Sequence, residues 1–262
     1  MRVLFVGDVV GRPGRETLLN LLPKIRALKG PIDFTIVNGE NSAAGKGITQ
    51  KIVEQYLAAG VDVITSGNHI WDKRDIMPML DQESRLLRPL NYPKGVPGHG
   101  YTIVTSKNSK KLAVVSLQGR VFMPLIDCPF KTIDELLPSL GDIPIFIDFH
   151  AEATSEKRVM AHYLDGRVSA LVGTHTHVQT ADEEILPSGT AYISDVGMTG
   201  SFYSSIGMTY ESVLPRFLTS LPTRFEVGEK DLRLNGVLID IDEEYGMATD
   251  IHRLAYKAGE LD

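Results

Sequence analysis

The sequence predicts an α/β protein whose core is a sandwich of two β-sheets flanked by helices. Three observations lead to this prediction. Strand and helix patterns alternate over the first 65 residues, strand patterns dominate the second half, and no repeat, linker or low-complexity tract interrupts the 262 residues. A chain of this length can form one large domain. We therefore expect a single domain that spans residues 1–262.

The first strand and helix are marked by an apolar run and a proline. Residues 3–6 form a short apolar run, typical of a strand that is buried on both faces. Helical spacing of leucines begins after Pro13 and stops at Gly30. Pro23 lies inside this helix and predicts a kink or an early end, because proline removes a backbone donor.

A second strand, a second helix and a third strand follow. The strands are expected at residues 33–37 and 61–65. Thr49 can cap the helix between them, which runs to Leu57 and ends at Gly60. This β-α-β-α-β order predicts a parallel sheet.

The rest of the chain predicts mainly strands. Residues 86–100 are rich in proline and glycine and indicate a long loop. The polar turn KNSK, residues 107–110, joins two strands that are expected to pair antiparallel. The expected strands are 101–106, 111–117, 143–149, 170–173, 191–194, 236–241 and 249–256, and the expected helices are 154–164 and a stretch near 208–219.

Charge and composition narrow the possible partners. The net charge of −6 offers no broad basic face, so we expect no general binding to nucleic acid, which depends on many Lys and Arg contacts to phosphates. The acidic net charge remains compatible with a small phosphate ester that binds in a metal site, because the metal ions supply the local positive charge.

The sequence also indicates a cytoplasmic protein. Cys128 is the single cysteine, which suits a reducing compartment, and we expect it to be a buried structural thiol. The apolar run at the N-terminus is shorter than the ~7–15 residues of a signal-peptide core. No run approaches the ~20 apolar residues that span a bilayer, so we expect no membrane association.

Polar side chains that can bind metals follow several of the expected strands. In open α/β sheets, ligands gather at the carboxyl ends of the strands, where these side chains would meet. Nitrogen and oxygen donors without a thiolate suit Mn, Fe or Zn, and they outnumber the ligands of one tetrahedral ion. The side chains are Asp8, Glu40, Asn41, Asn68, His69, His150, His175 and His177.

Each of these residues has an ordinary structural explanation when it is taken alone. His175 and His177 could be one core and one surface histidine, and His150 could be a core histidine after an apolar run. Asp8 could cap a helix and Asn68 could lie in a turn. The combination at successive strand ends favours a metal site.

The sequence blocks around these residues resemble those of the calcineurin-like metallophosphoesterase superfamily. The chain departs from the superfamily pattern at three positions. Val10 stands where a ligand histidine is usual, Glu40 stands where the aspartate that bridges the metals is usual, and Ile70 stands where an acidic residue is usual. These departures point to a narrower group, because the chain is similar, over nearly its whole length, to the bacterial YmdB-like phosphodiesterase family. The blocks include VGDVVGRPGR, NGENSAAGKGIT, SGNHIWD, DFHAEATSEK, VGTHTHVQTAD and YISDVGMTGS.

The resemblance implies two divalent or trivalent ions per chain, Fe or Mn, with Zn as an option. Glu40 would bridge them, and Asn41 would replace the ligand that Val10 cannot provide. We also expect a homo-oligomer. The implied ligands are Asp8, Glu40, Asn41 and His177 for one ion, and Glu40, Asn68, His150 and His175 for the other.

The implied activity is hydrolysis of small phosphodiesters, in particular 2′,3′-cyclic nucleotides. A hydroxide that bridges the metals would attack phosphorus, and His69 would act as the general acid for the leaving oxygen. Backbone N–H groups of 42–47 and 194–200 could line the substrate cleft, and Asp148 and Asp195 are interpreted as supporting residues.

Other functions remain open from the sequence. The same site could serve a phosphomonoesterase or a nuclease, and a regulatory protein could retain a largely silent metal site. A TIM-barrel metallohydrolase also uses an HxH motif, although there it normally follows the first strand.

Overall fold

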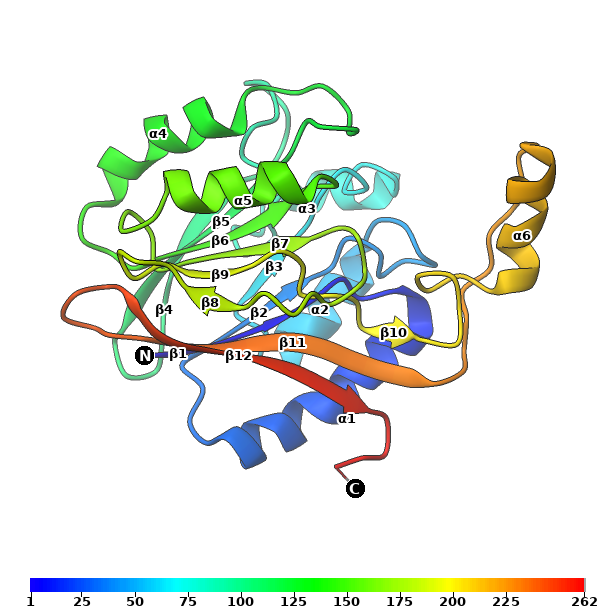
Figure 1. The fold of residues 1–262 in the computed structure, drawn as a ribbon, viewed down its shortest axis with the longest axis horizontal. Helices are drawn as coiled ribbons and strands as arrows, with labels where there is room; N and C mark the ends of the chain where they lie inside the picture. Colours follow the sequence, from blue (N-terminus) through cyan, green and yellow to red (C-terminus); the bar gives the residue numbers. More distant parts are fainter. Residues whose placement is uncertain (262) are drawn as a thin grey trace.

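The computed structural model describes residues 1–261 and contains two six-stranded sheets packed face to face, with helices on their outer sides (Figure 1). The two-sheet α/β fold expected from the sequence is confirmed. Because the described strands form two open sheets, the TIM-barrel alternative is wrong.

The first sheet is built around the opening β-α-β-α-β unit. Its first three strands are parallel, as predicted, and β11 pairs antiparallel with β1. Two further strands, β10 and β12, pair with β11. The strands are β1 (Arg2–Val6), β2 (Phe34–Asn38), β3 (Val63–Thr65), β10 (Gly200–Ser201), β11 (Leu232–Ile241) and β12 (Ala248–Lys257).

The second sheet has a parallel centre and antiparallel edges. Strands β5, β6, β7 and β9 are parallel, whereas β4 pairs antiparallel with β5 and β8 with β9. The strands are β4 (Tyr101–Thr105), β5 (Lys111–Gln118), β6 (Ile145–His150), β7 (Ala170–Thr174), β8 (Glu184–Ile185) and β9 (Ala191–Ile193).

Helices cover the outer face of each sheet. Helices α1 and α2 pack against the first sheet, and α4 and α5 against the second. Helix α6 stands away from both sheets (Figure 1). The elements are α1 (Gly11–Lys29), α2 (Gln50–Ala58), the 3-10 turn η1 (Arg74–Ile76), α3 (Met77–Leu80), α4 (Pro129–Leu140), α5 (Thr154–Tyr163) and α6 (Tyr210–Thr219).

Alternation along the strands produces these layers. In β1, Val3 and Phe5 lie in the core between the sheets, whereas Leu4 and Val6 lie in the core beneath the helices. The Phe5 and Phe146 rings meet across the sheets with centroids 5.4 Å apart. Because β1 is buried on both faces, its sequence is a continuous apolar run.

Some local predictions need correction. Helix α1 begins at Gly11 and continues through Pro23 to Lys29, so the early end did not occur. Thr49 occupies the N-cap of α2, but its side chain makes no capping hydrogen bond. Cys128 is partly exposed, not buried.

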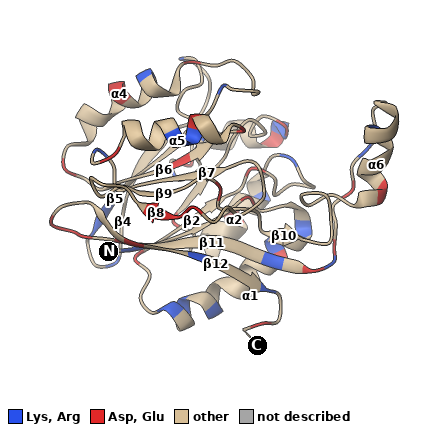
Figure 2. Ribbon diagram, in the orientation of Figure 1, with Lys and Arg blue, Asp and Glu red and all other residues tan. Residues whose placement is uncertain are grey.

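The surface charges agree with a chain that has no dominant basic face. Figure 2 shows acidic and basic residues interspersed along helices and loops of the molecule. In the described part of the chain, no helix has both the length and the apolar character needed to cross a membrane.

Candidate metal centre

The candidate ligands meet at the carboxyl ends of the parallel strands. Asp8 follows β1 and Glu40 follows β2, while His150 ends β6. His175 and His177 lie just beyond β7, with φ angles of 102° and 67°. Positive φ is unusual for residues other than glycine and is often found at functional sites. This turn lets two histidines near in sequence approach the same hollow.

The two carboxylates are almost completely buried and have different partners. Glu40 Oε1 accepts a hydrogen bond of 2.7 Å from the backbone N–H of His69, and Oε2 accepts one from the N–H of Gly67. Asp8 Oδ2 accepts one of 3.1 Å from the N–H of His175. Asp8 Oδ1 and Asn68 Oδ1 are buried without a hydrogen-bond partner among residues 1–261.

Burial shapes the protonation of these acids. It raises the pKa of Asp8 to about 7, and the nearby Asp195 carboxylate adds to the rise. Burial also raises the pKa of Glu40 to about 8, although the two backbone N–H groups oppose the shift. A buried carboxylate without positive charge favours the neutral form, so a cation at this position would restore ionisation.

A chain of hydrogen bonds fixes the tautomer of His150. Thr174 Oγ1 donates to Asp148 Oδ1 at 2.7 Å, and His150 Nδ1 lies 2.9 Å from the same hydroxyl. The hydroxyl hydrogen is already used, so Nδ1–H of His150 is the donor. Nε2 of His150 therefore carries a lone pair.

His175 directs a second lone pair at His150. Its Nε2 lies 3.2 Å from the Glu152 carboxylate, which places the ring proton there. His175 Nδ1 then faces His150 Nε2 at 3.0 Å, and Glu40 Oε1 lies 3.5 Å from the same atom of His150. Three potential metal donors, from His150, His175 and Glu40, therefore lie close together.

His177 shows the same arrangement with Asn41. Its Nδ1 donates to the carbonyl oxygen of Ile206 at 2.9 Å, so Nε2 carries the lone pair. Asn41 Nδ2 donates to the carbonyl oxygen of Gly45 at 3.1 Å, which turns Asn41 Oδ1 toward His177 Nε2 at 3.3 Å. Two acceptors again face each other.

The histidines are held in the neutral form that binds metals. Burial lowers the pKa of His175 to about 4 and also lowers the pKa of His177. The pKa of His150 lies well below its usual value, also chiefly because of burial. Neutral imidazole is the ligand form of histidine.

These groups fit metal ions in their chemistry. Partnerless oxygens and facing lone pairs are both satisfied by a cation, and the mixed N and O donors suit Mn, Fe or Zn. Among residues 1–261, no three His, Cys, Asp or Glu side chains surround one point closely enough to define an ion position. Asn41 lies with His177, and Glu40 with His150 and His175, which is compatible with the predicted allocation. The allocation itself stays a prediction.

Several supporting contacts surround the ligands. Asp148 also accepts hydrogen bonds from Thr65 and from Asn38. Asp195 pairs with the buried Lys157 at 2.8 Å, agreeing with the supporting position expected for both aspartates. Sequence reasoning missed Lys157, which lies on α5, and also Glu152, although Glu152 follows β6 by two residues just as Asp8 follows β1.

His69 lies next to Asn68 and is oriented by an acid that the sequence analysis missed. Its Nδ1 lies 2.9 Å from Asp72 Oδ2, and the ring is partly exposed. Burial lowers the pKa of His69, whereas Asp72 acts to raise it. The spacing of three residues between the two side chains was the available signal.

A cleft of about 460 Å³ opens beside the ligands. Gly45 and Lys46, which lie within the segment 42–47, line it together with His69. None of the described lining residues lies in 194–200, and the role expected for that segment stays a prediction. Thr199 instead supports the Asp8 loop, since its N–H donates to the Asp8 carbonyl oxygen at 2.8 Å.

Comparison with known proteins identifies the family. A family model described as "YmdB-like protein" matches residues 4–254. The chain belongs to the YmdB-like family. Three departures from the wider superfamily, at Val10, Glu40 and Ile70, were the sequence signal for this family, and the signal is confirmed.

Curated relatives of this YmdB-like chain include one with a named activity. A Bacillus subtilis protein named "2',3'-cyclic-nucleotide 2'-phosphodiesterase" is 53% identical over 97% of this chain and 96% of its own length. A Mycoplasma pneumoniae protein named "Putative phosphatase/phosphodiesterase" is 38% identical over 92% of this chain and 88% of its own.

Solved structures show the same fold. A hypothetical protein from Thermus thermophilus has a TM-score of 0.92 at 41% identity, covering 98% of this chain and 99% of its own. A structure described as a novel phosphatase from Mycoplasma pneumoniae has a TM-score of 0.91 at 35% identity, covering 98% and 93%.

Proposed function

We propose that this chain hydrolyses small phosphodiesters in a metal-dependent reaction, and that 2′,3′-cyclic nucleotides are its substrates. The observation that carries the proposal is the set of facing acceptors beside a cleft that also contains His69. The relative named as a 2′,3′-cyclic-nucleotide phosphodiesterase, at 53% identity over almost the entire length, supports the substrate class.

We further propose two ions per chain, Fe or Mn, with Zn as an option, bound by the ligands allocated above. When bound, such ions would polarise a phosphoryl oxygen and lower the pKa of an attacking water. The protein holds the ligands for this purpose: Thr174 orients His150, Glu152 orients His175, and two backbone N–H groups hold Glu40.

His69 supplies the proton that the reaction requires. Opening a cyclic ester forms one P–O bond from water and breaks another, so the departing ribose oxygen must gain a proton. Asp72 holds Nδ1–H of His69, which leaves Nε2 to carry the transferred proton. The Asp72 carboxylate also stabilises the protonated ring and opposes the loss of charge caused by burial.

Replacing His69 tests this role. We expect His69→Ala to lower kcat on 2′,3′-cyclic AMP by about 10²–10⁴-fold with bound metal unchanged, measured by elemental analysis. His162→Ala, on the exposed side of α5, is the matched control. An unchanged kcat in the His69 variant would contradict the assignment.

Phosphomonoesterase activity is the second candidate. Its support is the Mycoplasma pneumoniae structure described as a novel phosphatase. A panel of cyclic nucleotides, linear dinucleotides and nucleoside monophosphates, assayed with the metal-loaded protein, separates the two. Faster hydrolysis of monophosphates than of any diester would favour this candidate.

We also propose that residues 1–262 act as one domain in a cytoplasmic homo-oligomer. The single cysteine supports a reducing compartment. Light scattering measures the mass, and a monomer would contradict the assembly.

A further inference from the structure

An arm of residues 202–231 projects from the first sheet beside the candidate metal centre. It joins β10 to β11 and carries α6, which stands apart from the body (Figure 1). Among the described residues of α6, Val213 alone is buried. Phe217 is 81% exposed and Leu218 is 75% exposed. Apolar side chains this exposed indicate a surface that binds something.

The base of the arm is attached to the metal-centre residues. The carbonyl oxygen of Ile206 accepts the hydrogen bond from His177 Nδ1 at 2.9 Å. Met208 packs so closely on Gly45 that a Cβ at Gly45 would lie 2.3 Å from its terminal methyl carbon. The N–H of Thr209 donates to the Glu226 carbonyl oxygen at 2.8 Å, which joins the outgoing and returning segments of the arm. The arm therefore has a defined position relative to the ligands.

The cleft has two chemically different walls. His69, His175 and His177 line the side that belongs to the metal centre. Phe217 and Phe225 line the side that belongs to the arm. One hollow of about 460 Å³, a size typical of small-ligand sites, thus joins both walls.

We propose that Phe217 and Phe225 form a subsite for the base of a cyclic nucleotide whose phosphate lies at the candidate metal centre. This inference rests on the proposed function. A phosphate is strongly hydrated and gains nothing from an aromatic wall, whereas the flat face of a base stacks on such rings. The guanidinium of Arg216 lies 5.9 Å from the centre of the Phe225 ring and adds a second flat surface.

The substrates that test the subsite differ only in the presence of a nucleoside. We suggest 2′,3′-cyclic AMP and glycerol 1,2-cyclic phosphate, which share a five-membered cyclic ester. The value of kcat/KM is measured on both with the metal-loaded full chain. The ratio of the two values reports what the base contributes.

Variants of the arm separate the subsite from general damage. Phe217→Ala and Phe225→Ala remove the aromatic wall, and Phe217→Trp retains it. Leu218→Ala is the matched control, because Leu218 is exposed on the same helix but does not line the cleft. Light scattering of each variant reports the oligomeric mass.

We expect each alanine variant to lower the ratio by at least about fivefold, mainly through KM for cyclic AMP. Hydrolysis of the glycerol ester should stay within about twofold, and Phe217→Trp and Leu218→Ala should keep the wild-type ratio.

Two results would overturn the subsite while the proposed function stands: an unchanged ratio, or a parallel loss on both substrates with a changed mass. The second result would place the aromatic wall in an interface. If the wild-type protein cleaves neither substrate, the proposed function fails and the subsite fails with it.

Discussion

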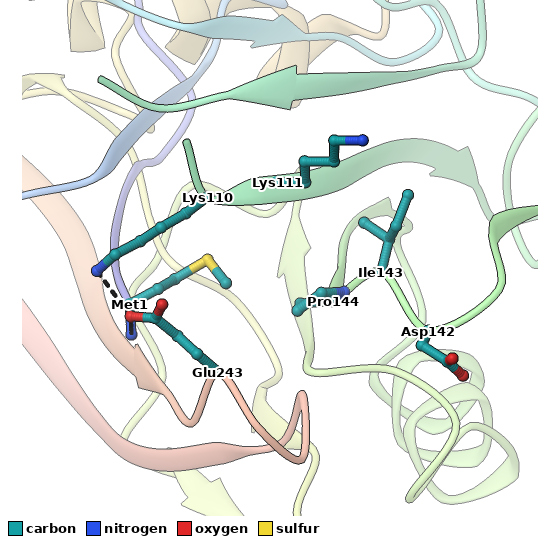
Figure 3. Close-up of a pocket in the computed structure, with 7 residues that line it drawn as sticks. All are labelled: Met1, Lys110, Lys111, Asp142, Ile143, Pro144 and Glu243. Atoms are coloured by element: carbon teal, nitrogen blue, oxygen red, sulfur yellow. Dashed lines mark ion pairs between the residues drawn. The ribbon is translucent and has the colours of Figure 1, made fainter. Parts of the chain in front are cut away.

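The two ends of the sheet sandwich both concentrate charged groups, but they satisfy them differently. At the amino ends of the strands, the Met1 ammonium pairs with Glu243 at 3.3 Å, and Lys110 Nζ lies 2.7 Å from the same residue (Figure 3). Arg2 pairs with Asp240 through two contacts of 2.7 Å. Here, positive groups already balance the negative ones.

At the carboxyl ends, acceptors face acceptors. His150 Nε2 lies opposite His175 Nδ1, and His177 Nε2 lies opposite Asn41 Oδ1. Asp8 Oδ1 is buried without a partner among residues 1–261. Native proteins satisfy most buried polar atoms, so the incomplete network at the carboxyl ends is compatible with a bound cation, whereas the complete one at the amino ends is compatible with a structural role.

The largest expected effect comes from exchanging one carboxylate at each end for its amide. Asp8→Asn should lower kcat/KM on cyclic AMP by more than about a hundredfold, since changes to groups around metal ligands alone cost about 10–100-fold. Asp240→Asn should leave kcat/KM unchanged. Both kcat/KM and the bound metal are measured for each variant. An equal loss of kcat/KM in the two variants would contradict the distinction between the two ends.

A smaller effect is expected where the network only orients a ligand. Thr174→Val removes the hydroxyl that fixes the His150 tautomer and should weaken metal affinity by about 10–100-fold. The control is Thr249→Val, whose exposed hydroxyl bonds to the Asp240 carbonyl oxygen. Metal titration followed by calorimetry measures both. An unchanged affinity would show that Thr174 does not position His150.

The pH dependence of stability sharpens the comparison further. Burial raises the pKa of Asp8 to about 7 and that of Glu40 to about 8 in the folded protein. Both values lie above the unfolded ones of about 4, so the contribution of these acids to the stability of the metal-free fold is complete below about pH 4 and is lost progressively as pH rises from about 4 to 7–8.

Metal binding requires the ionised carboxylates, so added Mn²⁺ should raise Tm more at pH 8.5 than at pH 6.5. We expect a difference of roughly 5 °C by calorimetry. At pH 6.5 and above, the buried histidines are neutral and contribute little to this difference. A Tm increase that is the same at both values would contradict the assignment of these acids to the metal centre.

The smallest effect is expected at the amino ends. Lys110→Met breaks the ion pairs to Glu243 and to Asp33. Lys110 and its partners remain partly accessible to solvent, and such pairs contribute little, so Tm should fall by less than about 3 °C and kcat/KM should not change. A larger loss of Tm in thermal melts would show that this network supports the fold more strongly than its exposure suggests.

Much of the architecture was accessible from local patterns. The apolar runs at β1 and β2 and the helix after Pro13 were predicted because strands buried on both faces and amphipathic helices leave clear periodicity. Helix α4 was not anticipated, although Pro129 at its first turn and the buried Ile133, Leu136 and Leu140 carry a helical spacing. It lies in the middle region, where the other sequence signals were weak.

The sequence determined which candidate ligands stand at the strand ends and their order. Parallel strands bring their carboxyl ends to one edge, so Asp8 and Glu40 had to lie close together once β1 and β2 were recognised, whereas His150 joins them only because the second sheet packs with its carboxyl ends on the same side. The gap at Val10 was equally informative. Val10 is fully buried in the structure, where it packs beside Gly207 of the arm.

Only the tertiary structure decided the tautomers of the histidines and the second wall of the cleft. Thr174 lies 24 residues from His150, and Ile206 lies 29 residues from His177. No local pattern encodes contacts between segments that meet only through packing of the two sheets and the arm. For the same reason, Phe217 and Phe225 gave no sign in the sequence that they line the cleft beside the candidate metal centre.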